Sequence, residues 1–115
     1  MPAPTAAALR RRRRKLIRDL PPLEQIMRGS LIERFKRCGR PGCHCANGPK
    51  GTGGHGPKLY LSVSVSGERP QMDYVPNARA ADVRTMVENF NKAREILNEI
   101  CAINTELLRR REELD

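Results

Sequence analysis

The last third of the chain, from Ala78 to about Leu114, contains neither glycine nor proline. Its apolar residues recur at alternating intervals of three and four, which places their side chains on one face of an α-helix. A helix of about 37 residues is roughly 55 Å long, far longer than a small sheet can cover. The spacing therefore predicts one long C-terminal helix over residues 78–115.

The same spacing fits the heptad repeat of a coiled coil. With Val83 at heptad position a, Asn104 also falls at an a position, between Ile100 and Leu107 at d positions. A single polar a residue is typical of oligomeric coiled coils, in which it fixes the register of the helices. We therefore predict a homo-oligomer, in its simplest form a dimer. The residues predicted at its interface are Phe90, Leu97, Ile100, Asn104 and Leu107.

The apolar stripe of this helix also has an intramolecular explanation. It is wider than a two-stranded seam needs, so the helix could instead fold back on the N-terminal segment and the sheet of its own chain. Both explanations keep the segment helical. The oligomer is favoured because the C-terminal half of so long a helix extends beyond any evident partner within the chain.

Three segments in the middle of the chain have the character of β-strands. Residues 58–66 alternate strictly, with leucines and valines on one face and Tyr60 and serines on the other. Residues 30–38 alternate less regularly, and residues 70–75 follow a turn at residues 66–69. Such alternation is the signature of half-buried strands. Together with the helix, these segments predict an α+β fold with a three-stranded antiparallel sheet that has one apolar face.

Positive charge is concentrated in the first half of the chain. Residues 1–58 contain 14 Lys and Arg against 3 Asp and Glu, a net charge of +11, whereas residues 59–115 contain 8 against 10, a net charge of −2. A polyanion such as nucleic acid is the expected partner of the first half. We expect three regions: a basic, partly disordered N-terminal arm over residues 1–22, a zinc knuckle with the sheet over residues 23–77, and the oligomerisation or docking helix over residues 78–115.

The basic region starts with an unbroken run of six cationic residues, Arg10–Arg14 and Lys15. Such a run can be a solvated tail, but here the positive charge continues into the cysteine-containing segment. Because the chain has only two Phe and two Tyr to stack on unpaired bases, double-stranded DNA is the expected ligand and RNA the alternative. The residues predicted to contact nucleic acid are Arg10, Arg11, Arg12, Arg13, Arg14, Lys15, Arg18, Arg34, Lys36, Arg37, Arg40 and Lys50.

Three cysteines and a histidine lie close together among glycines. Three thiolates and one imidazole are a common ligand set for a structural, tetrahedral zinc ion, so we predict that Cys38, Cys43, Cys45 and His55 bind Zn²⁺. The glycines of this segment would let a short loop converge on one ion. Two alternatives stay open: His44 could replace His55 as the fourth ligand, or the segment could be a reduced, metal-free loop.

Enzymatic activity is not expected. A thiol oxidoreductase would have a CxxC motif at the start of a helix, and the sequence CHC at residues 43–45 does not match it. A nuclease would have carboxylates near its metal, and residues 34–67 contain none. The chain also lacks the ~20 consecutive apolar residues of a membrane span and the apolar core of a signal peptide. We therefore expect a cytoplasmic protein.

The stretch "GSLIERFKRCGRPGCHCANG…HGPKLYLSVSVSGERPQMDYVP", followed by a long helix, resembles a small uncharacterised bacterial domain family. Its members share a CGxxxCxC knuckle, a following His-Gly-Pro, a hairpin that ends in Tyr-Val-Pro, and a helical tail. The resemblance covers about Gly29 to Leu108 and leaves the arginine run outside it. This chain departs from the family pattern by a longer glycine-rich insert between Cys45 and His55.

Proteins of this family are commonly encoded in or beside transposons and other mobile elements. The resemblance therefore implies an accessory role in DNA transactions, and with it an association with the bacterial nucleoid. The expected function is that of a zinc-stabilised, oligomeric DNA-binding accessory protein of a mobile element. The alternative is a protein-interaction adaptor whose long helix docks on a transposase or recombinase.

Overall fold

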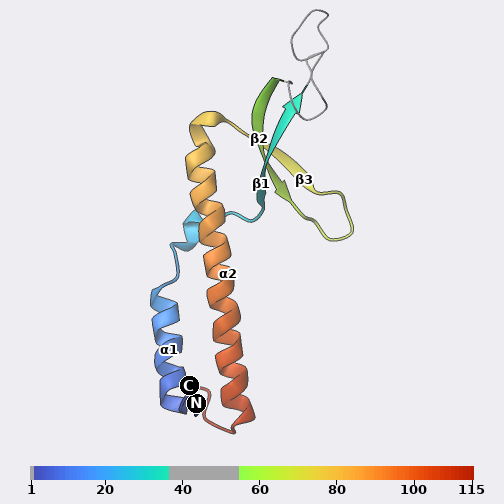
Figure 1. The fold of residues 1–115 in the computed structure, drawn as a ribbon. Helices are drawn as coiled ribbons and strands as arrows, with labels where there is room; N and C mark the ends of the chain where they lie inside the picture. The colour runs from blue at the N-terminus through green and yellow to red at the C-terminus, as the bar shows by residue number, and fades with distance from the viewer. Residues whose placement is uncertain (1, 37–54) are drawn as a thin grey trace, which may run out of the picture. The chain divides into compact units, whose positions relative to one another are not determined.

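The computed structural model describes residues 2–36 and 55–115 of the 115-residue chain (Figure 1). The chain divides into two compact units, Met27–Val87, and Met1–Ile26 together with Glu88–Asp115. The three-stranded antiparallel sheet and the long C-terminal helix confirm the predicted α+β class. The helices and strands are α1 (Ala6–Arg18), β1 (Ser30–Lys36), β2 (His55–Val63), β3 (Gln71–Val75) and α2 (Ala80–Arg109).

The unit formed by residues 27–87 contains the sheet, with strand order β1-β2-β3 and both pairings antiparallel. Leu31 lies opposite Leu61 in the first pairing, and Leu59 lies opposite Val75 in the second. Opposite residues of an antiparallel ladder project from the same side of the sheet. The register therefore gathers these apolar side chains on one face, as the alternation predicts.

Strand β2 ends at Val63, earlier than the end predicted at residue 66. The amide of Glu68 donates a hydrogen bond to the carbonyl of Val65 at 3.1 Å. Gly67 has a φ of 74°, a left-handed conformation that glycine adopts without a steric penalty from Cβ. The turn therefore begins at Val65, whose side chain is exposed instead of joining the apolar face.

The first turns of α2 cover the apolar face of the sheet. Leu59, Leu61 and Val75 are buried against Val87 of α2. Each of these buried side chains contributes about 1.5–3 kcal/mol by its removal from water. The apolar residues that are partly buried around this core are Met27, Leu31, Val63, Ala80 and Val83.

Gly29 lies just before β1, at a point where the backbone passes close to β2. Its φ of 140° is one that residues with a Cβ rarely adopt. A Cβ at this position would be 2.8 Å from Cδ1 of Leu61 and 2.9 Å from the carbonyl oxygen of Ser62. Both the conformation and the lack of space therefore require glycine here.

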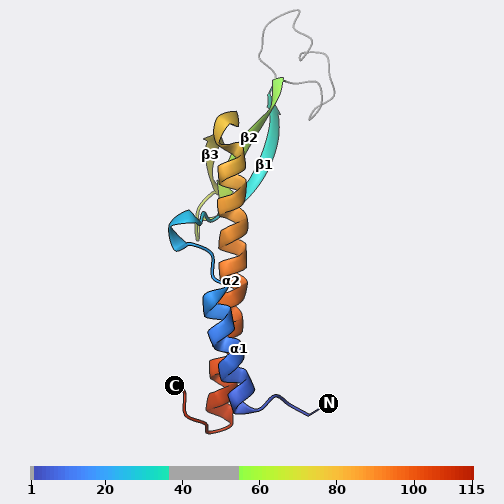
Figure 2. The same ribbon diagram turned by 90° about the vertical axis from the view of Figure 1, so that its left-hand side faces the viewer.

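The other unit consists of α1 and the C-terminal part of α2, which lie side by side and antiparallel (Figures 1 and 2). Oγ1 of Thr5 accepts a hydrogen bond from the amide of Ala8 at 3.0 Å and so caps the N-terminus of α1. The helix ends ahead of Pro21, because proline cannot continue a helix. The basic segment within residues 1–22 thus contains a helix that packs within its unit, and its role as a nucleic-acid-binding arm stays a prediction.

The core between these two helices is formed by Leu16 of α1 and by Ile96, Ile103 and Leu107 of α2. Leu107 is completely buried. The apolar residues that are partly buried around this core are Ala6, Leu9, Leu20 and Ile100. Part of the apolar stripe of α2 is therefore covered within the chain, which is the alternative that the sequence left open.

The residues predicted at an oligomer interface fall into two groups. Leu107 and Ile100, at d positions, belong to the core with α1. Leu97 and Asn104, at a positions, are exposed, and Phe90 is half-buried. The side of α2 that faces α1 thus uses heptad positions d and g, and the a positions adjoin it. Oligomerisation itself stays a prediction.

Helix α2 ends at Arg109, before the C-terminus to which the prediction extended it. Arg111 has a φ of 58°. The amide of Glu112 donates to the carbonyl of Leu107, and that of Arg111 to the carbonyl of Leu108, both at 3.0 Å. This hydrogen-bond pattern is a Schellman motif, which terminates the helix. Among the described residues, no helix is both long enough and apolar enough to cross a membrane.

Candidate nucleic-acid interface

The basic residues of α1 have two different kinds of surroundings. Arg10, Arg12 and Arg13 contact α2 or the residues that follow it. The other four basic residues of the helix are exposed and make no such contact. This division matters for function, because a side chain without a partner can bind a ligand without first giving up a contact within the protein.

Arg12 forms an ion pair with Glu99 of α2. Nη2 of Arg12 lies 3.0 Å from Oε2 and 3.2 Å from Oε1 of Glu99, and Nε lies 3.4 Å from Oε1. The two side chains are 48% and 43% exposed. Solvent-screened pairs of this kind contribute about 0–1 kcal/mol, so this pair orients α1 more than it stabilises the unit.

Arg13 and Arg10 hold the segment that follows α2. Nη1 of Arg13 donates to Oδ1 of Asn104 at 2.6 Å and to the carbonyl of Leu114 at 2.8 Å. Nη2 of Arg10 donates to the carbonyl of Glu113 at 2.7 Å, while Nε of Arg10 is buried without an acceptor among the described residues. A buried, unsatisfied donor costs about 1–3 kcal/mol. Three of the arginines predicted to bind nucleic acid therefore have a structural role.

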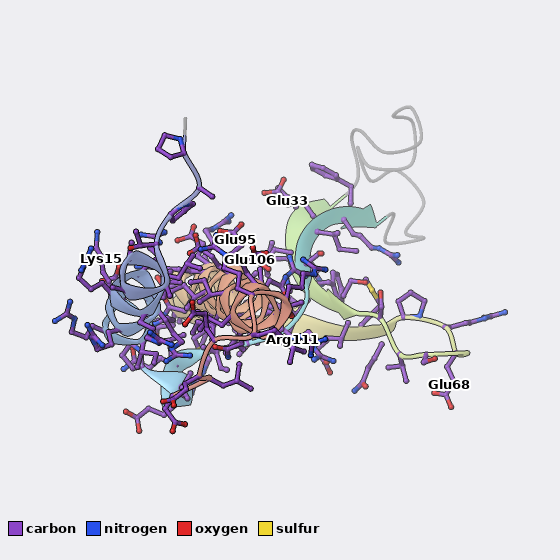
Figure 3. The ribbon with its side chains drawn as sticks, turned by 90° about the horizontal axis from the view of Figure 1, so that it is seen from below. Lys15, Glu33, Glu68, Glu95, Glu106 and Arg111 are labelled. Atoms are coloured by element: carbon purple, nitrogen blue, oxygen red, sulfur yellow. The ribbon has the colours of Figure 1, made fainter. Side chains whose placement is uncertain are left out.

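Arg11, Arg14, Lys15 and Arg18 form another side of α1, which we call the cationic stripe. Their spacing of i, i+3, i+4 and i+7 aligns them along one side of the helix over about 10 Å. All four are exposed, and none has a hydrogen-bond or ion-pair partner among the described residues. Figure 3 shows Lys15 on the side of α1 that faces away from α2.

The cationic stripe is under mutual repulsion. Like charges three or four residues apart destabilise a helix by about 0.2–0.5 kcal/mol per pair. The helix accommodates them because Thr5 caps its N-terminus and because Lys15 and Arg18, in its last turn, interact favourably with the negative end of the helix dipole. A polyanion bound along the stripe would remove the repulsion, and the helix already holds the four charges in a row.

Two further cations lie opposite each other in the sheet. Arg34 of β1 pairs in register with Lys58 of β2, and both side chains are exposed. Lys36, also predicted to bind nucleic acid, is the last residue of β1. The remaining basic residues predicted for this interface lie outside the described residues and are Arg37, Arg40 and Lys50.

The predicted zinc ligands lie mostly outside the described residues. This applies to Cys38, Cys43 and Cys45, and to the alternative ligand His44. His55 is the first residue of β2, and its backbone pairs with Lys36, the last residue of β1. Within the described ranges, 2–36 and 55–115, no cluster of His, Cys, Asp and Glu is arranged to hold a metal ion.

The sequence analysis missed an aromatic pair on the sheet. Tyr60 of β2 lies opposite Tyr74 of β3. Their ring centroids are 5.8 Å apart at an interplanar angle of 65°, an edge-to-face arrangement. The sequence contained the information to find this pair, because a hairpin whose turn is centred on Gly67 places these two residues opposite each other.

An apolar groove of about 420 Å³ lies within the sheet unit. Leu61, Val63 and Val75 of the strands and Val83 of α2 are among the residues that line it. Its apolar lining would suit an apolar side chain of a protein partner better than a phosphate group.

Comparison with protein families extends these observations. The model of a family described as a domain of unknown function (DUF6788) matches residues 6–85. The match includes the arginine run, which the resemblance found from the sequence had left out, and ends within α2. Neither the curated proteins nor the solved structures contain a match to the chain. Because the family model matches more than half of the 115 residues, the chain belongs to the DUF6788 family.

Proposed function

We propose that this protein is a zinc-stabilised DNA-binding accessory protein of a transposon or other mobile element, acting as an oligomer at the bacterial nucleoid. The observation that carries the proposal is the cationic stripe. Arg11, Arg14, Lys15 and Arg18 are aligned on a capped helix, and no described residue neutralises them. The association with mobile elements rests on the sequence resemblance alone.

The stripe suits a phosphate backbone because of its geometry and its charge. A protein that neutralises phosphates releases counterions, and each phosphate contact changes the logarithm of affinity by about 0.9 per decade of salt. At 0.1 M salt each contact therefore strengthens binding about eightfold relative to 1 M salt. Arginine and lysine contacts of this kind position a protein on DNA without reading its sequence.

The register of β1 and β2 supports the zinc part of the proposal. Lys36 and His55 are backbone partners, so their Cα atoms lie about 5 Å apart. Cys38 follows Lys36 by two residues, and the covalent chain limits that separation to about 7 Å. The covalent chain therefore does not prevent Cys38 and His55 from sharing one ion. Zinc held by three thiolates and an imidazole would supply folding free energy to a unit with a small core.

The proposal is tested by two variants with the same loss of charge. In the first, Arg11, Arg14, Lys15 and Arg18 are all replaced by glutamine, which has a high helix propensity. The matched control replaces four exposed arginines that have no partner among the described residues, namely Arg69, Arg79, Arg84 and Arg94. Binding to a labelled DNA duplex is measured by fluorescence anisotropy.

The stripe variant is expected to lose affinity by about eightfold for each phosphate contact removed at 0.1 M salt. The control is expected to lose much less, because only the long-range field of the protein changes. If the two variants lose affinity equally, net charge alone is responsible and the stripe is not the interface. If neither loses affinity, the protein does not bind DNA through α1.

A second candidate function is supported by the exposed apolar residues of α2. Leu97 is 54% exposed and Leu108 is 56% exposed, and Cys101 lies between them, also exposed. Apolar residues with this spacing suit a docking helix. In this alternative the protein is an adaptor for a transposase or recombinase. Replacement of Leu97 and Leu108 by glutamine would then abolish capture of the purified recombinase and leave DNA affinity unchanged.

A further inference from the structure

The sheet has a second face, formed by the residues that alternate with the apolar ones along each strand. Residues opposite each other across an antiparallel ladder share a face, as do residues two apart along a strand. Ile32, Tyr60 and Tyr74 form one cross-strand row, and Arg34 and Lys58 form the next row on the same face. None of these five residues is buried. We call these five residues the open face.

The aromatic row contains a tyrosine ring that is exposed to solvent. Tyr74 is 53% exposed. The edge-to-face contact with Tyr60 restricts the orientation of the Tyr74 ring. A ring that is both exposed and held in place is suited to stacking, because little side-chain entropy is lost when a second ring binds.

The second row of the open face, Arg34 and Lys58, favours the binding of an anion. Like charges directly opposite each other on neighbouring strands destabilise the pair. Neither Arg34 nor Lys58 has a carboxylate partner among the described residues. The described rows of this face, including the row of Ser30, Ser62 and Met72, contain no Asp or Glu. The repulsion is relieved when an anionic group binds beside the two side chains.

We propose that the open face binds single-stranded nucleic acid, with an unpaired base stacked on Tyr74 and neighbouring phosphates bound by Arg34 and Lys58. The two rows lie about 7 Å apart along the strands, so one ligand can contact both. The bases of a duplex are already stacked on each other, and only an unpaired base can offer its face to a tyrosine. This inference rests on the proposed function in one respect, that the ligand is a nucleic acid.

The aromatic count in the sequence pointed to duplex DNA, and the position of the tyrosines changes that expectation. Both tyrosines of the chain lie on this one face. A protein that holds duplex DNA through the cationic stripe and an unpaired strand through the open face would suit DNA ends or junctions. An acidic peptide would satisfy the cations but makes no use of an exposed aromatic ring.

The chain provides its own reporter, because it has two tyrosines and no tryptophan. Intrinsic fluorescence of the full-length protein therefore comes from the open face alone. The protein is titrated with oligo(dT), with an abasic deoxyribose-phosphate oligomer of the same length, and with a hairpin duplex; binding is followed in parallel by anisotropy of end-labelled probes. We expect oligo(dT) to quench the tyrosine emission and the other two probes to bind without comparable quenching.

Variants of Tyr74 measure the stacking. Loss of one base–aromatic stack costs about 1–3 kcal/mol, which corresponds to a roughly 5- to 150-fold loss of affinity. Tyr74→Leu is expected to lose oligo(dT) affinity in this range, while Tyr74→Phe, which keeps the ring, retains it. Replacement of Arg34 and Lys58 by glutamine is expected to reduce the salt slope of oligo(dT) binding by about 1.4, at about 0.7 per single-strand contact. Circular dichroism of each variant checks that the sheet is intact.

Four results would overturn the inference: oligo(dT) fails to bind, it binds without quenching, the duplex quenches as strongly, or Tyr74→Leu binds oligo(dT) as tightly as the unchanged protein. Displacement of oligo(dT) by an equal concentration of poly-glutamate would likewise assign the face to a protein partner. Failure here is distinct from failure of the proposed function. Loss of duplex DNA binding in the stripe variant tests α1. Quenching of tyrosine emission by oligo(dT) tests the open face, and it can be measured in the stripe variant as well as in the unchanged protein.

Discussion

Alanine substitutions at two leucines of α2 test whether α1 or a second copy of the chain covers the apolar stripe. The two explanations predict different losses in the free energy of unfolding. The coiled-coil assignment places both Leu97 and Leu107 in an oligomer interface. In the structure, Leu107 is completely buried in the core with α1, whereas Leu97 is 54% exposed. Leucine-to-alanine substitution at each position therefore separates the two explanations within one helix.

The structure predicts that Leu107→Ala destabilises the unit by about 2–5 kcal/mol, since the lost burial and the residual cavity both contribute. Leu97→Ala is expected to change stability by less than about 0.5 kcal/mol, as is usual for surface positions. Alanine has the higher helix propensity, which slightly favours both variants and so does not affect the comparison. The predicted difference is large compared with the error of the measurement.

Urea unfolding followed by circular dichroism at 222 nm measures both free energies, and repeating it at two protein concentrations detects coupling to assembly. Equal destabilisation by the two substitutions would refute the intramolecular core. A midpoint that rises with protein concentration in the unchanged protein but not in Leu97→Ala would instead place the exposed Leu97 in an interface between copies of the chain, beside the core with α1.

Three further predictions follow from particular backbone and ligand features. Gly29→Ala should destabilise the sheet unit by more than about 1 kcal/mol, because φ is 140° and the new Cβ would be 2.8 Å from Leu61. Thermal unfolding measures this, and an unchanged midpoint would contradict the close approach of Gly29 to β2. Arg111→Gly should stabilise the end of α2 by a few tenths to about 1 kcal/mol, because Arg111 has a φ of 58°; a less stable variant would mean that the Arg111 side chain is needed. One zinc ion per chain is expected by elemental analysis of protein purified without added metal, and Cys43→Ser should lose both the metal and the folded sheet. A ratio of zinc to chain near zero in the unchanged protein would show that zinc is not a structural component.

Much of the fold follows from periodicity in the sequence. The alternation in residues 58–66 identified the apolar face of the sheet, because one face had to be buried. The intervals of three and four identified α2 for the same reason. The end of α2 was not predictable from the sequence. A Schellman motif usually has a glycine at the position with positive φ, and here that position is occupied by Arg111.

The partner of α2 could not be chosen from periodicity alone. A seam of d and g positions has the same alternating intervals as a seam of a and d positions, so the sequence fits both. Only the packing of Leu16 against Ile96, Ile103 and Leu107 distinguishes them. The core with α1 uses the d positions of the predicted stripe together with the g positions, and an interface between copies of the chain at the a positions stays a prediction.

The candidate interface was predictable in part. The arginine run was evident, but its division required the positions of partners far away in sequence, such as Glu99 for Arg12. The spacing of Arg11, Arg14, Lys15 and Arg18 alone indicates one side of a helix, although it cannot say which side is free. The tyrosine pair could have been found by folding the predicted hairpin about its turn, since Tyr60 and Tyr74 are equally distant from Gly67.

The salt dependence of duplex DNA binding tests the central claim most directly. The logarithm of affinity is measured against the logarithm of salt concentration for the unchanged protein, for the variant with glutamine at Arg11, Arg14, Lys15 and Arg18, and for the matched variant at four other arginines. Four lost phosphate contacts should reduce the slope by about 3.6 in the stripe variant and leave the control nearly parallel to the unchanged protein. Parallel lines for the unchanged protein and the stripe variant would contradict the account, because the stripe would then make no contact with phosphate.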